Sequence, residues 1–360
     1  MSRRNGQVRT PRAGAPPGEL VHRAKLHWRV LPEARTDPKP PLSATHDPAD
    51  AAMCARARER YSSDRRFAFR RRGKAHAKMP NLIIIGGLKC GTTSIHHYLG
   101  LHPQIQMSKP KELNFFVSEL NWDLGLDWYA SRFDNRFEVR GESSPHYTNR
   151  PRFNGVAERI REHCPDARLI YMVRDPIKRV LSHWVHATGA GYETREMVPT
   201  LSAPDSGYVM RSQYWMQLEP YLDLFEREQI EVIAQEELQR ERDDTMRRAF
   251  GFAGVDPDFT SEQFDREWEK SSAKSSDKYQ FMEKAIKLPG LRAFDKNFDR
   301  LPESMRWVVE RVVHDPEAPP APKPELPASL QETLKGYFRE DATALQGFAG
   351  RDFPGWGDYS

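Results

Sequence analysis

A short apolar run that leads through a glycine-containing turn into a polar helix start constrains this chain more than any other segment. Residues 82–85 are apolar, Gly86 and Gly91 bracket the turn, and residues 92–94 read Thr-Thr-Ser. Glycines let the backbone curl so that successive N–H groups point inward, and a helix N-terminus adds partial positive charge where a phosphate would sit. The segment therefore predicts a phosphate-binding loop between a strand and a helix, with a tight structural connection as the alternative.

The loop differs from the GxxxxGK[ST] pattern of nucleotide hydrolases. Gly86, Gly91 and Thr93 fit this pattern, but Thr92 stands where the pattern has its lysine, and the lysine of this loop is Lys89. A lysine in the crown of the loop approaches a transferred group from a different side than a lysine at the helix start. The spacing disfavours an ordinary ATPase or kinase.

A second apolar run, residues 168–173, is followed by Arg174 and by a predicted helix that carries Ser182. Open α/β sheets bind ligands at the carboxyl ends of their strands, so Arg174 and Ser182 can converge on one anion. The arginine fork donates two hydrogen bonds and suits a terminal phosphate. Without the first loop, the same pair would be typical of a surface arginine and a helix serine.

Short apolar runs alternate with longer amphipathic stretches from residue 81 onward, which predicts an α/β fold. We expect a P-loop-like three-layer sandwich in which helices flank a central, mainly parallel sheet. The expected strands cover residues 82–85, 137–142, 168–173 and 230–234. The expected helices cover residues 93–101, 153–163, 177–187, 216–228, 243–251 and, after a proline-rich connector at residues 316–327, residues 328–347.

Residues 1–79 contain 19 lysines and arginines against 7 aspartates and glutamates, although the whole chain of 360 residues has a net charge of only +4. Their prolines and lack of apolar periodicity predict a mostly disordered extension, with one helix-forming stretch at residues 51–72. Residues 80–360 form the expected domain, and Met79, directly before the first strand, is a candidate biological start. A basic arm could recruit nucleic acid or anionic lipid, but we favour a solvated tail and expect no specific nucleic-acid partner.

The three cysteines, Cys54, Cys90 and Cys164, lack metal-like spacing and are too few for a disulfide framework, which is typical of a reducing compartment. No apolar run is long enough to span a bilayer, and the N-terminus lacks a signal-peptide core. We therefore expect a cytoplasmic protein without a transmembrane segment. His183 and His186 have no carboxylate or cysteine partner at suitable spacing, so no metal is expected. The oligomeric state cannot be read from the sequence.

Together, the two segments make the chain resemble the sulfotransferases that use 3′-phosphoadenosine-5′-phosphosulfate (PAPS), particularly bacterial members and heparan-sulfate-type domains. The KxGTTS loop of that family matches residues 89–94, and its RxPxxRxxS segment matches residues 174–182. The resemblance implies that the first segment holds the 5′-phosphosulfate and the second holds the 3′-phosphate, with no metal required. The donor-site residues that it implies are Lys89, Cys90, Gly91, Thr92, Thr93, Ser94, Arg174, Ser182, Tyr214 and Lys274, the last in a candidate cofactor-covering loop at residues 270–278.

The resemblance further implies an enzyme that transfers a sulfuryl group to a hydroxyl or amine by in-line displacement. Such a transfer depends on positioning and on a stabilised leaving oxygen more than on covalent help from the protein. Lys89 would neutralise charge on the bridging oxygen, and Glu112 would take the proton of the acceptor as general base. The alternative for Glu112 is a loop glutamate paired with Lys109 or Lys111.

Acceptor contacts are expected from Lys111, His97 and His146, and the acceptor is expected to be a carbohydrate, a lipid or a small metabolite. A P-loop nucleotide kinase or hydrolase stays as the alternative function, with Asp175 as a magnesium-positioning carboxylate. A binding protein that keeps the nucleotide fold without catalysis is a further alternative, which the presence of both Lys89 and Glu112 disfavours.

Overall fold

A five-stranded parallel sheet lies at the centre of the computed structural model, which describes residues 48–67, 79–265 and 324–359. The strands are β1 Leu82–Ile84, β2 Ile105–Met107, β3 Val139–Ser143, β4 Arg168–Val173 and β5 Ile230–Ala234. They run in the order β2-β3-β1-β4-β5, and every neighbouring pair is parallel. The four predicted strands are confirmed, and with them the α/β sandwich. The sequence pattern misses the edge strand β2 because its three residues include a glutamine and form no visible apolar run.

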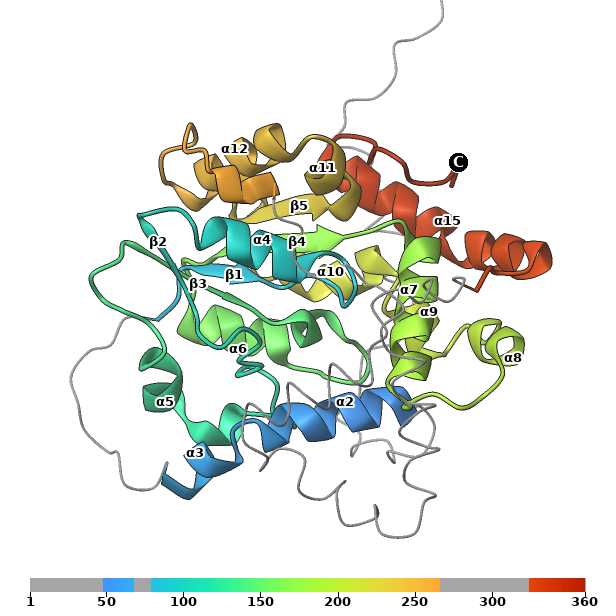
Figure 1. Ribbon diagram of the computed structural model, residues 1–360, viewed down its shortest axis with the longest axis horizontal. Coiled ribbons are helices and arrows are strands. Elements are labelled where there is room, and N and C mark those ends of the chain that lie inside the picture. Colours follow the sequence, from blue (N-terminus) through green and yellow to red (C-terminus); the bar gives the residue numbers. More distant parts are fainter. Residues whose placement is uncertain (1–47, 68–78, 266–323, 360) are drawn as a thin grey trace, which may run out of the picture.

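Helices flank this sheet (Figure 1). The crossover through α4 and the crossover through α6 run in opposite directions along the sheet, so right-handed connections place these helices on opposite faces. None of the helices in the described ranges combines the length and the apolar character needed to cross a membrane. The α-helices are α2 Pro48–Glu59, α3 Ser62–Phe67, α4 Thr92–Leu99, α5 Leu126–Ala130, α6 Val156–His163, α7 Pro176–Gly189, α8 Met197–Leu201, α9 Gly207–Met210, α10 Tyr214–Leu222, α11 Gln235–Arg240, α12 Arg242–Ala253 and α15 Ala328–Ala349, and the 3₁₀ helices are η2 Trp122–Leu124, η3 Pro145–Thr148, η4 Arg227–Gln229 and η5 Glu262–Asp265.

The predicted helices are present with small shifts at their ends, except for the helix expected at residues 216–228. There, α10 ends at Leu222, and η4 begins a new turn a few residues later. The side chains of Glu226 and Gln229 form a capping box at the start of η4, which satisfies the backbone N–H groups of this turn. One predicted helix is therefore two elements.

The central strands β1 and β4 are buried on both faces, which explains why they read as continuous apolar runs. A second apolar cluster joins α7, α9 and α15 through Trp184, Tyr208 and Phe338. The C-terminal helix α15 is also tied to α10, because the carboxylate of Asp341 accepts hydrogen bonds from the backbone N–H groups of Trp215 and Met216 (3.0 Å each). The last helix is thus fixed against α7 and α10.

Residues 48–67 form α2 and α3 and contact the sandwich, where the sequence indicates a helix-forming stretch at residues 51–72. Cys54 and Tyr61 are buried in the main core, and Asp64 accepts a hydrogen bond from Trp128 Nε1 (2.8 Å). A few apolar side chains suffice to dock these two short helices, because they pack against the core of the sandwich and the helices need no core of their own. Residues 1–47 and 68–78 lie outside the described residues.

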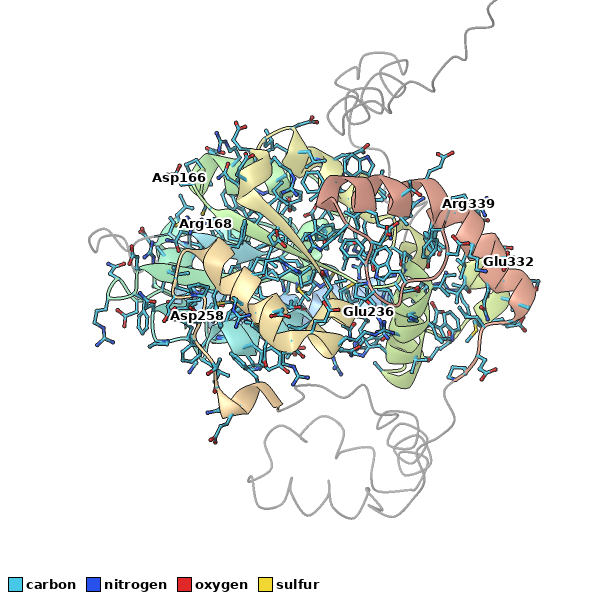
Figure 2. The ribbon with its side chains drawn as sticks, turned by 90° about the horizontal axis from the view of Figure 1, so that it is seen from above. Asp166, Arg168, Glu236, Asp258, Glu332 and Arg339 are labelled. Atoms are coloured by element: carbon cyan, nitrogen blue, oxygen red, sulfur yellow. The ribbon has the colours of Figure 1, made fainter. Side chains whose placement is uncertain are left out.

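Two glycine-to-alanine substitutions test the packing in opposite directions. A Cβ at Gly86 would lie 2.6 Å from the Cα of Met172, so Gly86→Ala forces β1 and β4 apart and should lower the free energy of unfolding by about 1–3 kcal/mol. Gly336 has open space around it in α15, between the exposed Glu332 and Arg339 (Figure 2), so Gly336→Ala should raise that free energy by about 0.4–1 kcal/mol. Urea denaturation measures both changes. An unchanged stability of Gly86→Ala would contradict the close approach of the two strands.

Candidate active site

A cavity of ≈ 360 Å³ opens at the carboxyl ends of the strands. The neighbouring strands β1 and β3 lead to α4 and α6, which lie on opposite faces of the sheet, so the chain leaves these two strands in different directions. Such a point is the usual ligand site of open α/β sheets. Residues that follow β1, β3, β4 and β5 line the cavity, among them Lys89, His146, Arg174 and Gln235. The topology therefore brings the two predicted anchor segments to one place.

Most of the predicted site residues line this cavity. They are Lys89, Gly91, Thr92, Thr93, Ser94, Glu112, His146, Arg174 and Ser182. Cys90 and Tyr214 are fully buried behind the loop, and Lys111 and His97 do not line the cavity. Lys274 lies outside the described residues.

The turn after β1 has the geometry of a phosphate cradle. Gly91 (φ 80°) and Lys89 (φ 69°) adopt the left-handed conformation, which is free of strain for the glycine and costly for the lysine. Gly91 is the N-cap of α4, so residues 92–94 make up the first turn of this helix. Backbone N–H groups in a first turn have no acceptor within the helix and carry the positive end of its dipole. This end of α4 can bind an anion.

The second anchor segment holds the loop in place. Arg174 Nη1 donates a hydrogen bond to the carbonyl of Lys89 (3.3 Å), and Arg179 Nη1 donates one to the carbonyl of Leu88 (3.5 Å). Arg179 is fully buried and also donates to the carbonyl of Tyr208 in α9 (2.5 Å). The two arginines therefore fix the phosphate loop relative to β4 and α7.

Cys90 and Tyr214 join the same parts from behind. The hydroxyl of Tyr214 lies 3.4 Å from Cys90 Sγ and accepts a hydrogen bond from the backbone N–H of Arg174 (3.3 Å). Burial raises the pKa of the Cys90 thiol to about 11, so this thiol is protonated at neutral pH. The structure thus places both residues in the support of the loop, away from the cavity surface.

Glu112 reaches the cavity from the segment between β2 and β3. Its Oε1 accepts a hydrogen bond from Lys111 Nζ (2.6 Å), which also donates to Thr92 Oγ1 (3.3 Å) at the start of α4. Burial raises the pKa of the Glu112 carboxyl, but the charge and hydrogen bond of Lys111, with His146 and Arg60, together outweigh burial and bring this pKa below its usual value. Lys111 therefore keeps Glu112 ionised.

A buried carboxylate fixes the backbone after Glu112. Glu142, fully buried at the end of β3, accepts hydrogen bonds from the hydroxyls of Ser144 (2.8 Å) and Tyr147. The same two hydroxyls accept hydrogen bonds from the backbone N–H groups of Asn114 (2.9 Å) and Phe115 (3.1 Å). The segment that carries the predicted base is thus attached to the core of the domain.

The histidines near the site differ in their surroundings. His146 lines the cavity from η3, although only 5% of it is exposed. His97 lies on α4, with its ring centroid 5.7 Å from that of His96. Burial, with the charge of Lys111, lowers the pKa of His96 to about 3, so His96 is neutral. Of the predicted acceptor contacts, His146 therefore faces the cavity and His97 does not.

Part of the cavity wall comes from residues that the motifs do not indicate. They are Met53, Arg56, Ala57 and Arg60 of α2 and the turn after it, and His186, Ala190 and Tyr192 at and beyond the end of α7. The arginine cluster within residues 51–72 is visible in the sequence, but its spacing does not show which part of the chain it meets. His186, which has no metal-ligating partner at suitable spacing in the sequence, also lines the cavity.

Asp175, the magnesium-positioning candidate of the kinase alternative, has both carboxylate oxygens engaged in the fold. Oδ1 accepts a hydrogen bond from the backbone N–H of Lys178 (2.9 Å) as the cap of α7, and Oδ2 accepts one from the backbone N–H of Gly357 (2.8 Å). Within residues 48–67, 79–265 and 324–359, no group of three or more histidine, cysteine, aspartate or glutamate side chains is placed to hold a metal ion. The polar groups around the cavity suit phosphate and sulfate oxygens.

A parallel α/β sandwich with a strand–turn–helix loop at its switch point defines a P-loop-like fold. Residues 79–294 match the family model described as the sulfotransferase domain, and the chain belongs to this family. The resemblance indicated by the two sequence motifs is thereby confirmed.

Relatives and a solved structure agree with this assignment. The membrane-associated sulfotransferase kil1 of Dictyostelium discoideum is 37% identical over 111 residues, which are 29% of this chain and 22% of that protein. The bifunctional heparan sulfate N-deacetylase/N-sulfotransferase 1 of Caenorhabditis briggsae is 26% identical over 186 residues, which are 45% of this chain and 21% of that protein. The matched stretches thus span only 21–22% of these two relatives.

The crystal structure of a sulfotransferase from Alicyclobacillus acidocaldarius has the same fold. It superimposes with a TM-score of 0.54 over 78% of this chain and 99% of that chain, at 24% sequence identity. The fold predicted from the sequence is therefore that of a solved sulfotransferase.

Tyr147→Phe tests the buried support of the segment after Glu112. The substitution removes the hydroxyl that joins Glu142 to the backbone N–H of Phe115, so two buried polar groups each lose a partner and the free energy of unfolding should fall by about 1–3 kcal/mol. The control is Tyr337→Phe, whose hydroxyl donates to the carbonyl of Ser202 at a partly exposed site and should contribute about 1 kcal/mol or less. Equal losses in urea denaturation would show that the Glu142 network has no special role.

Proposed function

We propose that this chain is a PAPS-dependent sulfotransferase that acts on a hydroxyl or amine of a carbohydrate, lipid or small-molecule acceptor. Membership of the sulfotransferase domain family supports the reaction class. One observation supports the mechanism: Lys89 in the phosphate cradle, the anchor residue Arg174 and the ionised Glu112 line one cavity. An in-line transfer needs a bound donor, a stabilised leaving oxygen and a base in one place.

The donor is proposed to lie with its 5′-phosphosulfate at the start of α4. The hydroxyl-bearing residues 92–94 line the cavity there, and the helix dipole favours negative charge. Lys89 is suited to neutralise the charge that grows on the bridging oxygen as its bond to sulfur breaks. Arg174 and Ser182 are assigned to the 3′-phosphate, where binding remote from the reacting sulfur fixes the position of this atom.

Glu112 is the proposed general base. As the acceptor oxygen or nitrogen forms its bond to sulfur, its proton passes to the Glu112 carboxylate. The bond between sulfur and the 5′-phosphate oxygen breaks, and adenosine 3′,5′-diphosphate leaves. Because Lys111 holds the pKa of Glu112 down, this carboxylate is ionised at neutral pH and can accept the proton.

The kinase alternative finds no support in this cavity. Asp175 is occupied by backbone N–H groups of α7 and of the C-terminal loop, and Thr92 stands where a nucleotide hydrolase has its lysine. No second function is proposed.

The cytoplasm is the proposed compartment. Cys54, Cys90 and Cys164 are buried and form no disulfide in the described part of the chain, which agrees with an environment that keeps thiols reduced. One relative is named a membrane-associated sulfotransferase, so an acceptor presented at a membrane belongs in the first screen.

Arg174→Ala tests the donor site. Calorimetry should show magnesium-independent binding of adenosine 3′,5′-diphosphate, weakened about 10- to 100-fold by the substitution because charge-assisted hydrogen bonds are lost. Arg168→Ala is the control, since Arg168 begins the same strand at its other end (Figure 2) and donates to the carbonyl of Ala253 (2.6 Å). A preference for ATP with magnesium would overturn the proposal in favour of the kinase.

Glu112→Gln tests the base. Turnover should fall about 10²- to 10⁴-fold, because the amide cannot take a proton, whereas the affinity for adenosine 3′,5′-diphosphate should not change. In the unmodified protein, the rate should hold on acidification until the pH falls below the usual glutamate range, because the pKa of Glu112 is lowered. The assay is transfer of a radiolabelled sulfuryl group from PAPS to an acceptor found by screening. Full turnover of Glu112→Gln would remove Glu112 from the mechanism.

A further inference from the structure

Helix α2 forms one wall of the cavity although it precedes the part of the chain that matches the family. The match begins at residue 79, whereas Met53, Arg56, Ala57 and Arg60 line the cavity. Figure 1 shows α2 below the sheet, extending from α3 at one end toward the lower end of α7 at the other. The guanidinium of Arg56, in the last turn of α2, lies 5.2 Å from the ring centroid of Tyr192, which also lines the cavity. Residues that precede the family match thus form part of the cavity wall.

Specific contacts attach this helical segment to the segment between β2 and β3. Tyr61 is only 4% exposed and packs edge-on against Trp128, with 5.1 Å between the ring centroids. Arg58 Nη1 donates a hydrogen bond to the carbonyl of Glu119 (2.7 Å), and Trp128 Nε1 donates one to Asp64 Oδ2 (2.8 Å). These contacts hold α2 in a defined position relative to the chain segment that carries Glu112.

Arg60 acts on the peptide group between Lys111 and Glu112. Arg60 Nη1 donates a hydrogen bond to the carbonyl of Lys111 (2.9 Å). The N–H of the same peptide, on Glu112, donates to the carbonyl of Ser143 in β3 (3.1 Å). Because the peptide is planar, bonds at both its carbonyl and its N–H fix its orientation, and with it the direction in which the Glu112 side chain leaves the backbone.

The backbone of Glu112 needs such a restraint. Its φ of 66° lies in the left-handed region, which a residue with a Cβ keeps only where the surrounding structure enforces it. The bond from β3 comes from the core, and the bond from Arg60 comes from the turn that ends α2. Loss of the Arg60 bond would leave the peptide held on one side only.

We propose that Arg60 is a positioning residue for Glu112, supplied to the active site by a helical segment that precedes the family domain. The proposal rests on the proposed function, in which Glu112 is the general base. Arg60 orients the Lys111–Glu112 peptide so that the carboxylate meets the proton of the acceptor within hydrogen-bond reach. The expected domain boundary at residue 80 therefore leaves out a part that catalysis uses, and a protein that starts at Met79 is expected to be a slow enzyme.

Arg60 also contributes to the ionisation of Glu112. Burial raises the pKa of Glu112, and Lys111, His146 and Arg60 together bring it below its usual value. Removal of the Arg60 charge must raise this pKa, so the acid limb of the pH–rate profile must move to higher pH. Lys111 and His146 keep their effect on Glu112, so the shift is partial.

The experiment compares Arg60→Ala with Arg58→Ala in the full chain. Both arginines belong to the same helical segment and donate to a backbone carbonyl of the segment between β2 and β3, but Arg58 does not line the cavity. Arg60→Ala should lower turnover about 10- to 100-fold, as expected for a misplaced base, and move the acid limb upward. Arg58→Ala should change neither. The affinity for adenosine 3′,5′-diphosphate should stay the same in both, because neither side chain belongs to the proposed donor site.

Arg60→Lys is the second variant, because it restores the charge and one donor and should recover part of the turnover and of the pH profile. An Arg60→Ala protein with unchanged turnover and acid limb would overturn the proposal. Equal losses in both alanine variants would also overturn it, because Arg60 would then act only through the docking of α2. The failure of the proposed function is a separate result, namely full turnover of Glu112→Gln or no binding of adenosine 3′,5′-diphosphate. NMR titration of labelled glutamate carboxyls, with Glu112→Gln for assignment, checks the pKa shift without any acceptor.

Discussion

The phosphate loop keeps its shape because a segment far along the chain donates hydrogen bonds to its backbone carbonyls. Arg174 and Arg179 reach the carbonyls of Lys89 and Leu88 from the turn after β4 and from α7. A buried guanidinium is costly unless its N–H groups find acceptors, and Arg179 meets this condition by donating to the loop and to α9 at once. The loop, the end of β4 and two helices therefore form one unit, to which the donor site is assigned.

The part of the cavity wall that contains Glu112 is held by hydrogen bonds from several separate elements. Glu112 lies on an irregular segment, so no helix or strand fixes its direction. Three sources replace regular structure: the end of β3 binds its N–H, the buried Glu142 network binds the residues that follow, and Arg60 binds the peptide before it. Lys111 then sets its charge state. A side chain on a loop can be held precisely where neighbouring elements restrain its backbone.

The two motifs at residues 89–94 and 174–182 could be recognised because each lies within one strand–turn–helix unit. The geometry of such a unit follows from local rules, so the amino-acid sequence was enough to assign Lys89 and Ser182 to one cavity. Such rules do not show that Tyr214, which the family resemblance implies for the donor site, lies buried behind the loop. They also fail for α2, because the arginine cluster within residues 51–72 does not show on which surface the helix docks. Burial and docking are properties of the assembled fold.

The amino-acid sequence by itself determined the α/β class, four of the five described strands and the position of the loop after the first strand, since these follow from hydrophobic period and glycine placement along the chain. The resemblance to the family rested on the KxGTTS and RxPxxRxxS motifs. The tertiary structure decided that α2 lines the cavity, that Arg60 binds the peptide before Glu112, and that Asp175 caps a helix instead of facing a ligand. The physical reason is the range of the interactions. Periodicity and turn chemistry act between neighbours in sequence, whereas the contacts of Glu112 with Arg60 and Ser143 join residues that only the folded chain brings together.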